Sequence, residues 1–136
     1  MLLLIDVTTW LKTLDTKFDN YYMGFLDKKK EKSLGVYNLK TPHAPIVAIG
    51  GLENTSYNVK RVSLLVHYNK ASDDTEEIAV ALYEEIMTSK PTDIGNHEVL
   101  FIGMLTNEPV DVGRDDNGVC EYVIEFEIYY KRIKEV

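Results

Sequence analysis

Cysteine is nearly absent from this sequence. Cys120 is the only one among 136 residues, which excludes a disulfide framework and a zinc site built on several cysteines. A lone unpaired thiol is typical of a reducing compartment. Long apolar runs are missing too, because the apolar start of the chain stops at Asp6, which is too short for a membrane span and has no basic leader of a signal peptide. These absences predict a soluble protein of the cytosol with no membrane partner.

Basic residues are also scarce. The chain has 15 Lys and Arg against 22 Asp and Glu, a formal net charge of −7. Proteins that grip nucleic acid usually carry a basic footprint, so the composition argues against specific nucleic-acid binding. The basic cluster at residues 28–32 is diluted by neighbouring acids and indicates a solvated loop. The remaining composition, 45% hydrophobic and 27% charged, is typical of one globular domain over residues 1–136.

Motifs of catalysis and cofactor binding are missing. The chain contains no Gly-x-Ser-x-Gly elbow and no phosphate-binding loop ending in Gly-Lys-Ser or Gly-Lys-Thr. Its three histidines, His43, His67 and His97, share no metal-ligand spacing and are expected on polar, solvated faces. We therefore expect no catalytic residue, no cofactor and no metal ion.

One arrangement of carboxylates leaves an alternative open. Glu125 and Glu127 share one face of a predicted strand, as paired metal ligands would, and Asp93 precedes them. A small metal-dependent hydrolase would use these three groups, but a solvated acidic face explains them more simply. Asp115 and Asp116 resemble calcium ligands, yet the twelve-residue loop with its terminal Glu is absent, and a hairpin turn accounts for them.

Apolar periodicity predicts two helices. Asp6 is suited to cap the first, which runs to about Phe18. The second begins at Ser72 or Asp73, with a glutamate three residues after Asp73 completing a capping box, and it ends before Pro91.

Alternation of apolar and polar residues predicts the strands. The first two are expected to form a hairpin, residues 40–59 are expected to be irregular, and residues 114–118 are expected to form a turn. The predicted strands are residues 21–26, 34–39, 61–69, 99–105 and 119–131.

The order of these elements predicts an α+β fold, with a small mixed or antiparallel sheet and two helices packed on one face. The last strand alternates strictly, so one of its faces is core and the other is wet and acidic. The strand at 99–105 is apolar on both faces, so it is either central or an edge that a partner covers. Such a sheet has more apolar surface than two helices cover, which indicates self-association or docking.

Several segments give this chain a family resemblance. They lie in the strands, the second helix and the late turn. They read SLGVY (33–37), RVSLLV (61–66), AVALY (79–83), PVDVGRDDNG (109–118) and FEIYY (126–130). Together they resemble the minor capsid or tail-completion proteins of long-tailed bacteriophages, and the chain is similar to the tail terminators among them.

The resemblance implies a structural role without turnover. Tail terminators are small α+β proteins that assemble as a hexameric ring at the head-proximal end of the tail tube, end tube polymerisation and provide the head-joining surface. The implied partners are further copies of the chain, the tail tube protein and the head–tail connector, while DNA passes through the lumen without specific binding. The implied location is the tail or neck of the virion, with assembly in the host cytoplasm.

Two other readings of the same features stay open. A connector or adaptor on the head side would also be a small α+β ring protein. A non-viral binding module would add a partner's strand to an edge of its sheet.

Candidate interaction residues follow from position in the predicted elements. Strand edges and the outer sheet face are expected to make ring contacts, and the irregular segments are expected to project. The ring or partner candidates are Val99, Phe101, Gly103, Leu105, Tyr129, Tyr130 and Arg132. The projecting-loop candidates are Pro42, His43, Glu53, Tyr57, Arg114, Asp115, Asp116 and Asn117.

Overall fold

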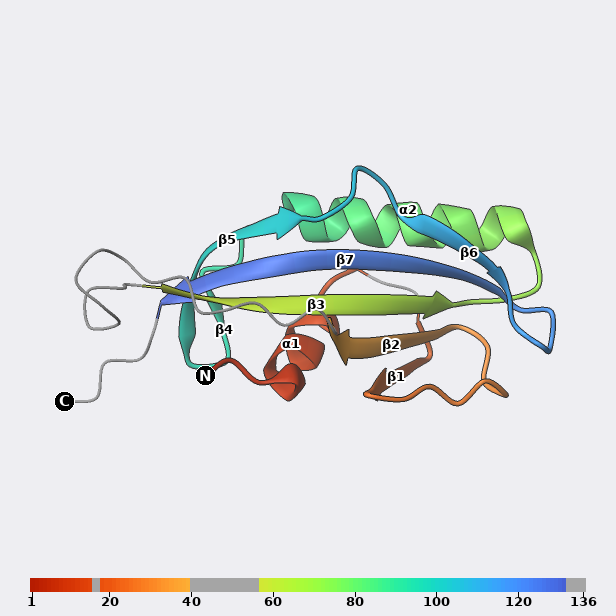
Figure 1. Ribbon diagram of the computed structural model, residues 1–136, viewed down its shortest axis with the longest axis horizontal. Helices are drawn as coiled ribbons and strands as arrows, with labels where there is room; N and C mark the ends of the chain where they lie inside the picture. The colour runs from red at the N-terminus through yellow and green to blue at the C-terminus, as the bar shows by residue number, and fades with distance from the viewer. Residues whose placement is uncertain (16–17, 40–56, 132–136) are drawn as a thin grey trace.

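The computed structural model describes residues 1–15, 18–39 and 57–131, and within these ranges it contains two helices and seven strands (Figure 1). The helices are α1 (Leu4–Leu11) and α2 (Ser72–Thr88). The strands are β1 (Asn20–Met23), β2 (Ser33–Asn38), β3 (Tyr57–His67), β4 (Asp93–Ile94), β5 (His97–Met104), β6 (Val110–Arg114) and β7 (Cys120–Lys131). Among the described residues, neither helix has the length and apolarity needed to cross a bilayer.

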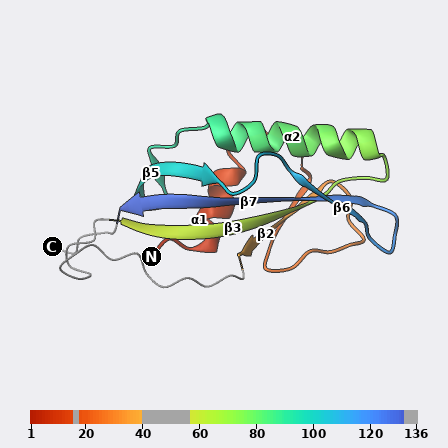
Figure 2. The ribbon, with the colours of Figure 1, turned by 45° about the horizontal axis from the view of Figure 1, so that its top comes forward.

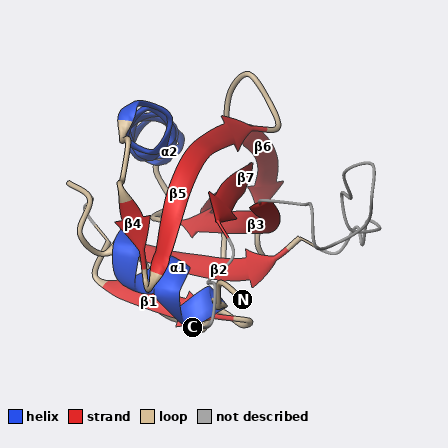
Figure 3. Ribbon diagram, turned by 90° about the vertical axis from the view of Figure 1, so that its left-hand side faces the viewer, coloured by secondary structure: helices blue, strands red, loops and turns tan. Residues whose placement is uncertain are grey.

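The strands join in one curled, mixed sheet, which confirms the α+β class. Its order is β1-β2-β3-β7-β5-β4, and β6 also pairs with β7. The long strands β3 and β7 run antiparallel from the pair Tyr57 and Lys131 to the pair His67 and Glu121. The other edge of β7 is divided, because β6 pairs with its first half and β5 with its second. Figures 2 and 3 show how β5 curves along β7 beside α2.

The core lies against one face of β7. Phe126, at the centre of that face, is fully buried and meets the ring of Trp10 from α1 edge-on, with centroids 6.4 Å apart. On the same face, the Tyr122 hydroxyl donates a hydrogen bond to Glu76 of α2 at 3.3 Å. The alternation predicted for β7 is confirmed, with its buried residues being Cys120, Tyr122, Ile124, Phe126, Ile128 and Tyr130.

The first helix is shorter than predicted. It begins at Leu4 and ends at Leu11, where a helix to Phe18 was expected. Asp6 does cap it, but from the third helical position, where its carboxylate accepts a hydrogen bond from the Leu3 N–H at 3.1 Å. At the other end the Thr13 hydroxyl donates to the Trp10 carbonyl at 2.6 Å. This side chain offers the last turn a local alternative to continued helix.

The predicted hairpin of the first two strands is wrong. β1 and β2 are parallel, with Asn20 beside Ser33 and Met23 beside Val36. The charged segment between them carries the chain back to the starting end of β1 before β2 begins. Its last residue, Lys32, donates its N–H to the Tyr68 carbonyl at 2.6 Å, which aligns β2 for antiparallel pairing with β3. The lysines of this segment are exposed, as expected for a solvated loop.

The second helix has its predicted length but not its predicted cap. The N-cap position is Ala71, no side chain caps it, and the expected capping box is absent. Asn69 takes over, because its side-chain oxygen accepts hydrogen bonds from the Ala71 N–H at 3.0 Å and the Thr75 hydroxyl at 3.2 Å. Asp73 and Asp74 still lie in the first turn, where their charges suit the positive end of the helix dipole.

The irregular segment predicted for residues 40–59 falls mostly outside the described residues. Its last part is wrong, because residues 57–59 already belong to β3. The later turn is confirmed: Gly118 donates its N–H to the Asp115 carbonyl at 3.0 Å. Gly118 adopts a φ of +81°, a conformation that glycine reaches without strain.

The histidines differ from the expectation of solvated side chains. His67 is fully buried and His97 is 4% exposed, while His43 lies outside the described residues. Each buried ring has polar partners. His97 packs edge-on against Tyr130 and lies 3.4 Å from the Lys131 carbonyl, and His67 contacts Glu121 at 2.9 Å. Pairing of this kind permits burial of a polar side chain.

We expect Phe126→Ala to lower the free energy of unfolding by roughly 3–5 kcal/mol, because it removes a buried aromatic ring from the core. Glu127→Ala, one residue along on the opposite face, is the matched control. It removes an ion pair with Arg61 at 2.9 Å and a hydrogen bond from the Tyr129 hydroxyl, and it should cost less than the loss of the ring, about 1–3 kcal/mol. Urea denaturation of both variants measures the difference. A larger loss for Glu127→Ala would contradict the register of β7.

Candidate interaction surface

Strand β5 has an open edge. On one side it pairs with β7, from the pair Val99 and Tyr130 to the pair Met104 and Phe126. On the other side the short strand β4 pairs with His97 and Glu98, and the Val99 N–H donates to the Thr92 carbonyl at 2.9 Å. Beyond that point no strand among residues 1–15, 18–39 and 57–131 pairs with this side of β5. An unpaired edge presents N–H and carbonyl groups that a second chain can pair with.

Exposed apolar side chains concentrate along this edge and its continuation. Phe101 of β5 is 55% exposed, an unusual position for so large an apolar ring. The others lie on β5, on β6 and in the connection between them. We call the whole set the β5–β6 patch, and it consists of Leu100, Phe101, Leu105, Val110 and Val112. Exposed apolar side chains gathered on neighbouring elements make this region a candidate interaction surface.

Three aromatic rings cross the outer face of the sheet. Phe101 stacks on Tyr129 of β7, with centroids 4.2 Å apart and planes 12° from parallel. Tyr57 of β3 lies on the other side of Tyr129, at 5.9 Å. Rings stacked in this way hold one another in fixed orientations. The outer face therefore presents a rigid aromatic strip made of Tyr57, Tyr129 and Phe101.

A charged pair anchors this strip. The Tyr129 hydroxyl donates a hydrogen bond to Glu127 at 3.3 Å, and Glu127 forms an ion pair with Arg61 at 2.9 Å. Burial raises the pKa of the Tyr129 hydroxyl above its ordinary value, and the negative charge of Glu127 raises it further. The hydroxyl therefore stays protonated at neutral pH and remains a donor.

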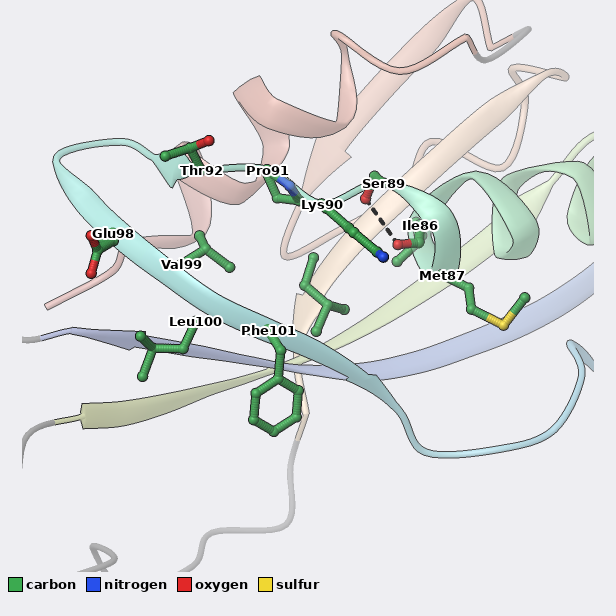
Figure 4. Close-up of a pocket in the computed structure, with 11 residues that line it drawn as sticks. Ile86, Met87, Ser89, Lys90, Pro91, Thr92, Glu98, Val99, Leu100 and Phe101 are labelled. Carbon is green, nitrogen blue, oxygen red and sulfur yellow. Dashed lines mark hydrogen bonds between the residues drawn. The ribbon is translucent and has the colours of Figure 1, made fainter.

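A groove of about 570 Å³ lies between the end of α2 and β5. Its walls include Ile86, Met87 and Lys90 from the helix side and Val99 and Ile102 from the strand (Figure 4). In Figure 4 the Phe101 ring lies on the other side of the β5 ribbon from Lys90. Phe101 is also one of the residues that line the groove, so the groove and the aromatic strip meet at this residue.

The predicted ring candidates fall into three groups. Phe101 and Tyr129 are brought into direct contact, with Gly103 next to both rings and Val99 and Leu105 near the two ends of β5. Tyr130 is only 3% exposed, and its hydroxyl accepts a hydrogen bond from the Leu2 N–H at 3.2 Å. It therefore offers almost no surface in the single chain. Arg132 lies outside the described residues.

The projecting-loop candidates are placed only in part. Pro42, His43 and Glu53 lie outside the described residues, and Tyr57 is the first residue of β3. The turn of residues 114–118 does lie at one end of the molecule, where Asp116 and Asn117 are exposed (Figure 1). Arg114 bends back to donate to the carbonyls of Lys70 and Gly118.

The hydrolase alternative gains no support from the geometry. Asp93 lies opposite Glu98, whereas Glu127 lies opposite Gly103 farther along β5, so the sheet separates the proposed ligands. Glu127 is already engaged by Arg61. Within the described part of the chain, the three side chains that do gather potential ligand atoms are His67, Asp115 and Glu121.

Comparison with known families matches this chain to one of them. The family described as "Bacteriophage tail terminator protein" matches residues 3–132, which is almost the whole chain. A search of curated proteins found no match. The family match confirms the resemblance seen in the strand and turn segments of the sequence. The chain belongs to the bacteriophage tail terminator family.

Proposed function

We propose that the protein assembles as a ring, with six copies as the expected number, at the head-proximal end of the tail tube. There it ends tube polymerisation and presents the surface that joins the head. The observation that carries this proposal is the family match over residues 3–132. The partners it requires are neighbouring copies of the chain, the tail tube protein and the head–tail connector.

The open edge of β5 supports the assembly part of this proposal. A closed ring needs each copy to present a surface that its neighbour covers. The β5–β6 patch offers exposed apolar side chains, unpaired backbone groups and the rigid Phe101–Tyr129 stack in one place. Large aromatic side chains of this kind are enriched at protein interfaces. We therefore assign the contact between neighbouring copies to this patch.

The acidic composition suits a ring through which DNA passes. Each copy carries a formal net charge of −7, so a ring has a strong negative field. Like charges repel the phosphate backbone and keep it from sticking to the wall. In this proposal DNA passes through the lumen of the ring without binding to it specifically.

Deleting the gene from the phage should leave full heads beside detached tails of uncontrolled length, because nothing then stops tube growth. Electron microscopy of lysates measures both features, and a plasmid copy of the wild-type gene should restore normal particles. Tails of normal length beside heads that leak or lack DNA would instead assign the protein to the head-side connector. Infectious particles without the gene would contradict both assembly roles.

Replacing Phe101 by lysine should block assembly without unfolding the chain, because the side chain is 55% exposed and a charge there opposes burial by a neighbour. Phe25→Lys is the matched control, since Phe25 is 60% exposed and lies just after β1, far from β5 in the strand order.

Both variants are tested for rescue of the deletion phage, and thermal unfolding verifies that each is folded. We expect Phe25→Lys to restore plaques and Phe101→Lys to reduce their number at least ~10-fold, since interface anchors of this type cost about 2 kcal/mol or more when lost. Full rescue by Phe101→Lys would exclude the β5–β6 patch from the contact.

A further inference from the structure

His67 is a buried histidine with two different polar environments around its ring. It ends β3 directly opposite Glu121 and is fully buried. Its Nε2 lies 3.2 Å from the Lys28 carbonyl oxygen. A carbonyl only accepts, so Nε2 carries the proton and donates it there. Nδ1 is left facing two carboxylates.

The two carboxylates approach Nδ1 from different segments. Glu121 at the start of β7 places Oε2 at 2.9 Å, and Asp115 in the β6–β7 turn places Oδ2 at 3.7 Å. The three candidate atoms lie within 4.8 Å of one another. A single small cation placed among them can contact all three.

Asp115 supplies an independent sign of a missing partner. Its side chain is only 1% exposed. Oδ1 accepts hydrogen bonds from the N–H groups of Asn117 and Val119, both at 2.9 Å. Oδ2 points into the cluster and has no hydrogen-bond partner among the described residues. A buried carboxylate oxygen without a partner costs free energy, so its position calls for an occupant.

Two backbone N–H groups donate to the Asp115 carboxylate. Burial by itself raises the pKa of this carboxyl, but hydrogen bonds from the Val119 and Asn117 N–H groups, together with the charge of Lys28 and the charge that His67 carries when it is protonated, outweigh it. The net pKa lies below the ordinary value.

We propose that His67 Nδ1, Asp115 Oδ2 and Glu121 Oε2 bind a divalent transition-metal ion of the Zn²⁺ type. Imidazole nitrogen with carboxylate oxygen suits such ions better than Mg²⁺ or Ca²⁺, which prefer oxygen alone. Zinc sits about 2.0–2.2 Å from ligands of these kinds, so two of its ligand atoms lie up to about 4.4 Å apart. The distances of 2.9 Å and 3.7 Å from Nδ1 to the two carboxylate oxygens fall within that limit. The Nε2 donor bond to a backbone carbonyl is also the arrangement that orients histidines in metal sites.

A proton on Nδ1 is the competing occupant, and it satisfies the cluster less well. An Nδ1–H group would donate to Glu121 at 2.9 Å and leave Asp115 Oδ2, at 3.7 Å, beyond hydrogen-bond reach. A metal ion would instead contact all three atoms. It would also tie together the end of β3, the start of β7 and the β6–β7 turn, and through His67 the segment that contains Lys28. The role of the ion is therefore structural.

Calorimetric titration of ZnCl₂ into the metal-free full chain tests the site. We expect one Zn²⁺ per chain for the wild type. Asp115→Asn should weaken binding at least ~10-fold, because loss of even an outer partner of a metal ligand costs that much. Glu125→Gln is the control, since it removes a carboxylate from the same strand as Glu121 without touching the cluster. MgCl₂ at the same concentration should not compete.

Thermal unfolding with and without Zn²⁺ gives a second readout. Zn²⁺ should raise the Tm of the wild type and of Glu125→Gln but not that of Asp115→Asn. The asparagine keeps an oxygen for the Asn117 and Val119 N–H groups, so the turn should survive. If Asp115→Asn does not fold, Glu121→Gln decides. No Zn²⁺ binding by the wild type, or unchanged binding in the cluster variants, would overturn the site, and stability that follows pH alone would assign it to a proton.

Discussion

The antiparallel pairing of β3 with β7 is the interaction on which the rest of the molecule depends. It runs without interruption from the pair Tyr57 and Lys131 to the pair His67 and Glu121. Its inner face supplies the centre of the core, including the fully buried Phe126, and its outer face carries Tyr129. One end of the pairing brings His67 to Glu121. The core, the aromatic strip and the proposed metal site therefore all depend on the same alignment of β3 with β7.

Strong local patterns predicted these two strands and the buried face of β7, while their pairing with each other, like other contacts between distant segments, did not show in the sequence. The alternation of β7 identified its buried face because a strand has a fixed period of two. The parallel pairing of β1 with β2 was not predicted, because a charged segment of that length fits a hairpin loop equally well. The cap of α2 was not predicted, because Asn69 precedes the N-cap position Ala71 and lies outside the usual capping pattern.

The candidate surfaces show the same division. Phe101 and Tyr129 were proposed as contact residues from their place on apolar strands, but their stacking on each other, next to a register shift in β5 between Val99 and Phe101, was not predicted. The cluster of His67 with Asp115 was not predicted, since only the pairing of β3 with β7 brings the turn beside the histidine. As a member of the tail terminator family, the protein is a structural part of the phage tail and meets other tail or head components in the virion.

The division of one β7 edge between β5 and β6 has a mechanical consequence. The two short strands are separated by a connection that contains the buried Pro109 and is held to α2 by the Tyr83 hydroxyl, which donates to the Thr106 carbonyl at 2.6 Å. A strand from another chain that pairs with β5 therefore reaches a break in the sheet edge between β5 and β6, and not a long, flat edge. Proteins limit endless sheet growth by breaking their edges in this way. A strand from another chain can thus pair with β5 without starting an endless sheet.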